Sequence, residues 1–189
     1  EVAGVSDDDY QRLAELAAGP RVVAIGETGL DYHWDRTTPQ EQRAHFRRHL
    51  DLARQAGKPV MIHDRQAHDD VLDVLRRDGA PEAGVVFHSF SGDAQMARYC
   101  GQRGWYLSIS GVVTFRNAPA LREAVEAAPM DLLLAETDAP FLTPHPYRGR
   151  PNSPSLTPWT VRALAAVKRV DEAVMCATLE LNAARLFGW

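Results

Sequence analysis

The chain has 189 residues, 45% of them hydrophobic, which is enough to bury a core as one domain. Its formal net charge of -4 argues against a protein that coats nucleic acid through a generally basic surface, although a local cationic patch is compatible with it. Two cysteines, Cys100 and Cys176, are too few for a disulfide framework and fit a reducing compartment. No signal peptide or apolar run of membrane-spanning length occurs, so we expect a cytoplasmic protein that does not bind a membrane.

The predicted elements begin with a helix and then alternate between short apolar strands and further helices. A capping-box pattern at Ser6 and Asp9 opens the first helix, for which Leu13 and Leu16 supply an apolar stripe. A second capping pattern, at residues 38–41, opens the next helix. Five segments have the apolar character of buried strands, namely residues 22–25, 59–62, 85–87, 106–109 and 132–135.

A helical pattern follows each of these five strands. Five strand-then-helix units in series predict parallel strands with right-handed crossovers, in an α/β fold. The composition does not shift along the chain, so we expect a single domain over residues 1–189. The architecture is then either an open doubly wound sheet or part of a (β/α)₈ barrel. No glycine-rich phosphate loop follows any strand, which counts against a nucleotide-binding sheet.

Metal-ligand side chains follow the apolar cores of four predicted strands. These residues are Glu27, His63, His88 and Asp138. Both α/β architectures build their sites at the carboxyl ends of the strands. Taken singly, such a histidine is more often a hydrogen-bonded packing residue, and a glutamate beside glycines is more often a turn residue. The joint occurrence of the four predicts a metal site.

The proposed donor set contains imidazole and carboxylate groups and no hydroxyl or thiol nucleophile. Mixed nitrogen and oxygen donors suit Zn²⁺, Mn²⁺, Fe²⁺ or Ni²⁺ better than an all-oxygen Mg²⁺ cage. An ion at such a site can lower the pKa of bound water to about 7. The residues therefore predict hydrolysis by metal-activated water.

Five segments, in chain order, resemble the successive motifs of the TatD family. They are residues 26–32 (GETGLDY), 60–65 (VMIHDR), 87–92 (FHSFSG), 136–142 (ETDAPFL) and 182–187 (NAARLF). TatD proteins are metal-dependent deoxyribonucleases with a TIM-barrel fold in the amidohydrolase superfamily. The resemblance implies that fold, and a 3′–5′ exonuclease that uses two divalent ions per active site, such as Zn²⁺, Mg²⁺ or Mn²⁺.

The resemblance also implies a role for each residue of the site. Glu27 would bridge the two ions, and His63 and His88 would complete the ligands of the second ion. Asp138 would hold the first ion and take the proton from the attacking water. Glu136, two residues before Asp138, is expected to support the site rather than to bind an ion.

For the substrate, the resemblance implies single-stranded DNA or a DNA 3′ end, bound by a monomer. Arg65 is similar to a family residue that meets the substrate phosphate; the alternative is a salt bridge at a strand end. A loop at residues 146–154 resembles the segment that lines the family's DNA groove and carries Tyr147, Arg148 and Arg150. These side chains could engage phosphates and stack on a base. Ser153 departs from the family's usual Asn-Glu-Pro, so it is given no role.

Two family motifs have no counterpart in this chain. The family begins with a strand that ends in His-x-His, and its third strand ends in Gly-x-His-Pro-His; neither sequence occurs here. Because a TIM barrel usually needs about 250 residues, we expect strands one to three to be missing and the chain to cover the last five units. The first ion would then lack two histidine ligands, so we expect this chain alone to bind one metal better than two.

Three functions remain open from the sequence. The first is the metal-dependent nuclease, favoured by Arg65 and the arginine-bearing loop. The second is an amidohydrolase-type metallohydrolase of small esters or amides. The third is a truncated barrel without catalytic activity, which acts as a binding or structural module.

Overall fold

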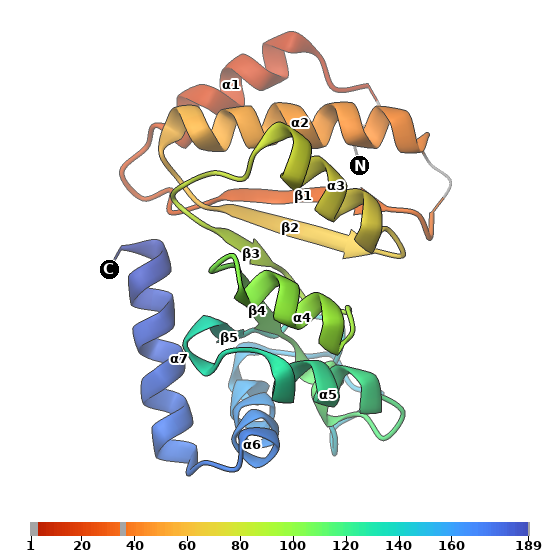
Figure 1. Cartoon of the computed structure of the whole chain (residues 1–189), viewed down its shortest axis with the longest axis vertical. Coiled ribbons are helices and arrows are strands. Elements are labelled where there is room, and N and C mark those ends of the chain that lie inside the picture. Colours follow the sequence, from red (N-terminus) through yellow and green to blue (C-terminus); the bar gives the residue numbers. More distant parts are fainter. Residues whose placement is uncertain (1–3, 35–36, 189) are drawn as a thin grey trace. The chain divides into compact units, whose positions relative to one another are not determined.

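The computed structural model describes residues 4–34 and 37–188, and its strands and helices alternate along the chain (Figure 1). Among the described residues, the strands are β1 (Ile25–Asp31), β2 (Val60–Arg65), β3 (Val85–Phe87), β4 (Tyr106–Ile109) and β5 (Leu133–Ala135). They form a sheet in the order β1-β2-β3-β4-β5. The pairs β1–β2 and β4–β5 are parallel. The predicted α/β class with parallel strands is thereby confirmed, whereas the predicted absence of three barrel strands stays a prediction.

The described helices are α1 (Asp7–Ala17), α2 (Pro39–Ala56), α3 (His68–Asp78), α4 (Ala94–Gly101), α5 (Pro119–Ala127), α6 (Thr157–Lys168) and α7 (Glu172–Phe187). Three short 3₁₀ helices accompany them: η1 (Gly111–Thr114), η2 (Met130–Leu132) and η3 (Pro154–Leu156). None of the helices described is both long enough and apolar enough to cross a membrane.

The described chain divides into two compact units, and the boundary falls inside β3, after Val86. The first unit runs up to residue 86 and includes residues 186–188; the second comprises residues 87–185. The expectation of a single domain stays a prediction, and each unit is described by itself below.

In the first unit, α2 lies along β1 and packs against it (Figure 1). Both predicted capping boxes are present, so the first turns of α1 and α2 have their backbone donors satisfied. The core face of α2 is formed, as predicted, by Phe46, Leu50 and Ala53, which are fully buried. These apolar side chains fix α2 on the strands that carry the first half of the site.

The predicted apolar stripe of α1 is wrong. Leu13 and Leu16 are exposed, whereas Tyr10 is buried. The reason is that α1 packs on α2 through the Tyr10 ring, which stacks on His45 at a centroid distance of 5.8 Å. The Tyr10 hydroxyl also lies 2.7 Å from His45 Nδ1.

The second unit is built from β4, β5 and helices α4 to α7. Helix α4 packs against α5, and α6 packs against α5, η1 and β5. Strands β4 and β5 lie within one residue of their predicted bounds. Asn182 of α7 is buried and donates to the carbonyl oxygens of Met130 and Leu133, at 3.0 and 2.8 Å. This amide ties the last helix to the start of β5.

Candidate metal centre

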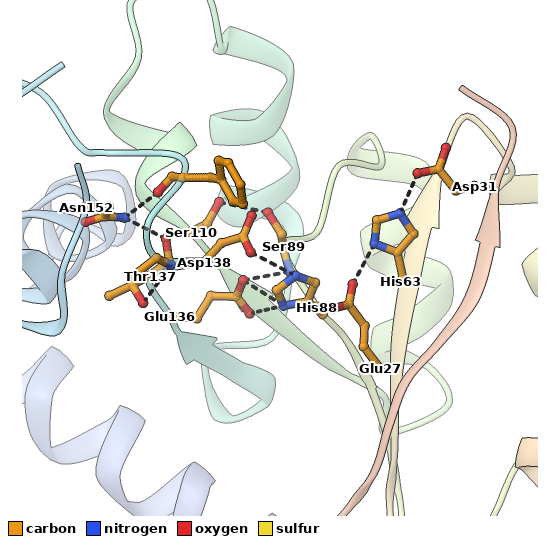
Figure 2. A network of polar contacts seen from close by, with 12 residues as sticks. Glu27, Asp31, His63, His88, Ser89, Ser110, Glu136, Thr137, Asp138 and Asn152 are labelled. Carbon is orange, nitrogen blue, oxygen red and sulfur yellow. Dashed lines mark hydrogen bonds and ion pairs between the residues drawn. The ribbon is translucent and has the colours of Figure 1, made fainter. Parts of the chain in front are cut away.

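The first half of the candidate site lies on β1 and β2, in the first unit. His63 Nδ1 is 2.7 Å from Glu27 Oε1, and His63 Nε2 is 3.1 Å from Asp31 Oδ2 (Figure 2). The side chains of His63 and Glu27 are 33% and 47% exposed. Two carboxylates therefore bracket one imidazole at a place that solvent reaches.

The sequence placed Glu27 and His63 after the ends of their strands, and the structure places both within strands. Strand β1 starts at Ile25 and continues to Asp31, instead of ending at residue 25. The register against β2 shifts between Ile25 and Thr28, so Glu27 lies in an irregularity of the β-bulge type. Bulges of this kind redirect side chains and are frequent beside active sites.

The electrostatics of this half-site favour a cation. The pKa of His63 is raised, chiefly by its hydrogen bond with Glu27, while burial opposes the rise. The charge of Glu27 and the contact with Asp31 raise the pKa further. Both carboxylates therefore favour a positive charge between them. The same donor atoms fit a divalent ion, because neutral imidazole and carboxylate are ordinary ligands of such metals.

A cavity of about 480 Å³ opens beside these residues in the first unit. Its lining includes Glu27, Asp31 and His63 together with Trp34, Gln42 and His49. The half-site is therefore accessible from a concave surface.

The second half of the candidate site lies in the second unit, at residues that follow β3 and β5. His88 Nδ1 is 3.0 Å from Glu136 Oε1, and its Nε2 is 3.6 Å from Asp138 Oδ1 (Figure 2). Glu136 Oε1 also accepts the Ser89 backbone N–H at 3.0 Å. The side chains of His88 and Glu136 are only 15% and 17% exposed, whereas that of Asp138 is 32% exposed. An imidazole held between two carboxylates thus recurs here.

The segment around Asp138 is held by a residue for which the sequence gave no role. Asn152 is buried and its Nδ2 donates to the carbonyl oxygens of Thr137 and Phe141, each at 2.7 Å. Asp138 itself has a φ of 56°, a left-handed conformation that aspartate tolerates better than most residues. A single asparagine in a loop rich in turn residues carries no pattern that would reveal such contacts.

Of the predicted substrate residues, Arg65, Arg148 and Arg150 are exposed and Tyr147 is half-buried. Arg65 ends β2 in the first unit, with its guanidinium 5.7 Å from the Trp34 ring. In the second unit, the Arg148 guanidinium lies 3.6 Å from the Phe115 ring. The Tyr147 ring is 5.6 Å from that of Trp159. The Arg150 carbonyl accepts a hydrogen bond from Thr143 Oγ1 at 2.5 Å. These contacts leave the roles of the four residues as proposals.

The fold and the two half-sites together define a class of protein. A parallel α/β sheet carries histidines and carboxylates on or directly after its strands, where such folds place their sites. Glu27, His63 and His88 are among the described residues that could hold a metal ion. The class is that of α/β proteins whose strand-end side chains are of the types that bind divalent metals.

The chain belongs to the TatD related DNase family, which matches residues 1–188. It is 50% identical to the uncharacterized metal-dependent hydrolase TatD of Mycobacterium tuberculosis, over 98% of this chain and 72% of that protein. It is 37% identical to the 3′-5′ ssDNA/RNA exonuclease TatD of Escherichia fergusonii, over 94% of this chain and 70% of that protein. The resemblance drawn from the five motifs is thereby confirmed.

A solved structure supports the same relationship. The TatD homolog YJJV of Escherichia coli K12 superimposes with a TM-score of 0.91 at 30% identity, covering 98% of this chain and 72% of that one. The chain thus shares the fold of a TatD homolog over nearly its whole length.

Proposed function

We propose that this chain carries the site of a divalent-metal-dependent hydrolase that cleaves DNA phosphodiester bonds, as a 3′–5′ exonuclease. The observation that carries the proposal is the pairing of His63 with Glu27 and of His88 with Asp138, in a chain of the TatD related DNase family. The name of the Escherichia fergusonii relative, an ssDNA/RNA exonuclease, supports a nucleic-acid substrate.

Glu27, His63, His88 and Asp138 would hold the ions, two in the complete site, with Zn²⁺, Mn²⁺ or Mg²⁺ as candidates. Bound divalent ions polarise a phosphodiester and lower the pKa of a coordinated water. The nitrogen and oxygen donors of these residues suit Zn²⁺ or Mn²⁺ best.

Asp138 is the proposed general base of the reaction. Its side chain is nearly twice as exposed as that of Glu136, at 32% against 17%, so an incoming water can reach it. The base removes one proton from this water as its oxygen attacks phosphorus. The bond from phosphorus to the 3′ oxygen of the preceding nucleotide breaks, this oxygen takes up a proton from solvent, and a nucleoside 5′-monophosphate is released.

Arg65, Tyr147, Arg148 and Arg150 are the proposed substrate contacts. Arginine guanidiniums suit phosphate oxygens because they present several donors in a plane. A tyrosine ring offers a face on which an unpaired base stacks, whatever its sequence. Single-stranded DNA exposes both its phosphates and its unpaired bases. It is therefore the substrate class that these side chains favour.

The test uses single-stranded DNA labelled at either end, incubated with the chain and Mn²⁺. We expect the 3′ label to leave as mononucleotide at once, while the 5′-labelled strand shortens stepwise, and EDTA to stop both. Asp138→Asn keeps the side chain's shape and should slow the reaction about 100-fold or more. Release of a 5′ label first would contradict the direction of cleavage.

Two other results would favour the alternatives. Hydrolysis of a chromogenic small ester without degradation of DNA would indicate a metallohydrolase of small esters or amides. Metal uptake without hydrolysis of either substrate would indicate a binding module.

A further inference from the structure

We propose that Asp31 and Glu136 are positioning residues that fix the tautomers of the two histidines, directing Nδ1 of His63 and Nε2 of His88 toward the metal. This inference rests on the proposed function, since it concerns the same ligands. It gives Asp31 a role at the site for the first time and makes the expected supporting role of Glu136 specific.

Asp31 is itself held in place on every side. The Gln42 side chain is buried; its Oε1 accepts the Asp31 N–H at 2.8 Å, and its Nε2 donates to the Asp31 carbonyl at 2.9 Å. Asp31 Oδ1 accepts the backbone N–H groups of His33 and Trp34, at 2.9 and 3.3 Å. The remaining oxygen, Oδ2, lies 3.1 Å from His63 Nε2. Hydrogen bonds therefore hold Asp31 in place, whereas the side chain of Glu27, on the other side of the imidazole, is nearly half exposed.

Glu136 repeats this arrangement at His88. Both of its oxygens lie near His88 Nδ1, at 3.0 and 3.1 Å, and Oε1 also accepts the Ser89 N–H. The opposite ring nitrogen, Nε2, faces the more accessible Asp138. In each unit, then, the carboxylate that accepts backbone N–H groups is the less exposed of the two, at 25% for Asp31 against 47% for Glu27 and at 17% for Glu136 against 32% for Asp138.

The hydrogen-bond partners of each histidine ring select one of its two neutral tautomers. A neutral imidazole carries one N–H, and an ionised carboxylate can only accept a hydrogen bond. His63 Nε2, which faces Asp31, and His88 Nδ1, which faces Glu136, therefore keep the ring proton and donate it. The other nitrogen presents its lone pair on the side of the proposed ligand carboxylate. Partners of this kind orient metal-binding histidines and raise their basicity.

The test changes the charge and the hydrogen-bonding sense of each carboxylate while keeping its shape. In Asp31→Asn and Glu136→Gln, an amide NH₂ can turn toward the histidine and demand an acceptor there. Zn²⁺ affinity is measured by competition with a chromogenic chelator, and the ring tautomers by ¹⁵N NMR of the zinc-loaded protein. We expect each variant to bind Zn²⁺ about 10–100-fold more weakly. Wild type should show the ring proton on Nε2 of His63 and on Nδ1 of His88.

Matched controls separate this effect from the loss of a surface charge. Asp78 accepts a hydrogen bond from Arg47 at 2.8 Å in the first unit, and Glu126 pairs with Arg169 at 3.0 Å in the second. Asp78→Asn and Glu126→Gln should leave the Zn²⁺ affinity unchanged. Wild-type affinity and unchanged tautomers in Asp31→Asn and Glu136→Gln would overturn the inference.

His63→Ala and His88→Ala distinguish failure of the inference from failure of the proposed site. Loss of zinc in these two, but not in Asp31→Asn and Glu136→Gln, would reject only the positioning roles. Full zinc binding in His63→Ala and His88→Ala would reject the metal site and the inference together. Should a variant fail to fold, the wild-type tautomers decide, because a ring proton on Nδ1 of zinc-loaded His63 contradicts the inference.

Discussion

Gly29 lies so close to the backbone of His63 that a Cβ at Gly29 would come within 2.0 Å of the His63 carbonyl oxygen. Gly29 also has a φ of 137°, which side-chain-bearing residues rarely adopt. This approach allows β1 to run beside β2 past Glu27, with Gly29 opposite His63 in the register. The position of the first half-site therefore depends on the absence of a side chain.

Gly29→Ala should destabilise the protein by more than about 3 kcal/mol, beyond the range of most single substitutions. The clash is with backbone atoms, which cannot rotate away. The measurement is the free energy of unfolding in urea. Gly104→Ala is the control, because its φ is 68° but a Cβ there meets nothing within 4 Å, so we expect a loss of about 1–2 kcal/mol. Equal losses in the two variants would show that the close approach is unimportant.

Asn152→Ala should lower both the stability of the fold and the rate of DNA hydrolysis per folded molecule. The substitution removes the donor that holds the carbonyls of Thr137 and Phe141 on either side of Asp138. Each carbonyl that is left unpaired costs about 1–3 kcal/mol. Displacement of Asp138, the proposed general base, can lower the rate up to about 100-fold. Unfolding in urea and initial rates of DNA degradation measure the two effects.

Asn182→Ala is the matched control for Asn152→Ala, since Asn182 is also buried and also donates to two carbonyls. It should lose stability to a similar degree but keep its rate per folded molecule. A similar fall of the rate in both variants would argue that Asn152 acts only through stability.

Arg148→Ala should weaken DNA binding and reduce the dependence of affinity on salt. A guanidinium that contacts one phosphate contributes about 1 to the slope of log K against log salt concentration. Fluorescence anisotropy of a labelled oligonucleotide at several salt concentrations measures the slope. Arg103→Ala is the control, because Arg103 also lies over an aromatic ring, at 3.4 Å from that of Tyr99, but outside the loop at residues 146–154. An unchanged slope in Arg148→Ala would remove this residue from the substrate contacts.

His49 should make the fold sensitive to acid. Burial, and to a lesser degree the charges of His45 and Arg48, lower the pKa of His49 below its ordinary 6.5. Between the lowered pKa and 6.5 the unfolded chain binds more protons than the folded one, so stability rises with pH in that window. Stability is fully present above pH 6.5 and is lost as pH falls through the lowered pKa of the folded state.

The urea midpoint of His49→Gln should therefore fall less than that of wild type between pH 7.5 and pH 5. His145→Gln, at an exposed histidine, is the control and should track wild type. If the urea midpoint of His49→Gln fell with pH in parallel to that of wild type, the His49 imidazole would not be a cause of the acid sensitivity.

Local sequence patterns predicted most of the second unit and the helices of the first. Strand β5 was predicted from its apolar run, and α2 from its capping residues and its buried face of Phe46, Leu50 and Ala53. Strand β1 was placed too early. The segment predicted to be the strand, residues 22–25, is more apolar than the observed strand. Gly26 and Gly29 look like turn residues but permit close strand pairing.

For the site, the sequence predicted the residue types but not their partners. Glu27, His63, His88 and Asp138 were found because each follows the apolar core of a predicted strand. The contacts of Asp31 with His63 and of Glu136 with His88 join residues 32 and 48 positions apart. Such contacts depend on strand register and loop geometry, which no periodicity in a single sequence reveals.

The central claim is that DNA hydrolysis depends on metal held by these histidines and carboxylates. The most direct measurement compares wild type with His63→Ala after both are stripped of metal and then supplied with Mn²⁺, scoring metal uptake and DNA degradation on the same samples. His145→Ala is the matched control and should keep its metal. We predict that Mn²⁺ restores both uptake and degradation in wild type and neither in His63→Ala. Degradation at the wild-type rate in His63→Ala, or degradation that no chelator stops, would contradict the claim.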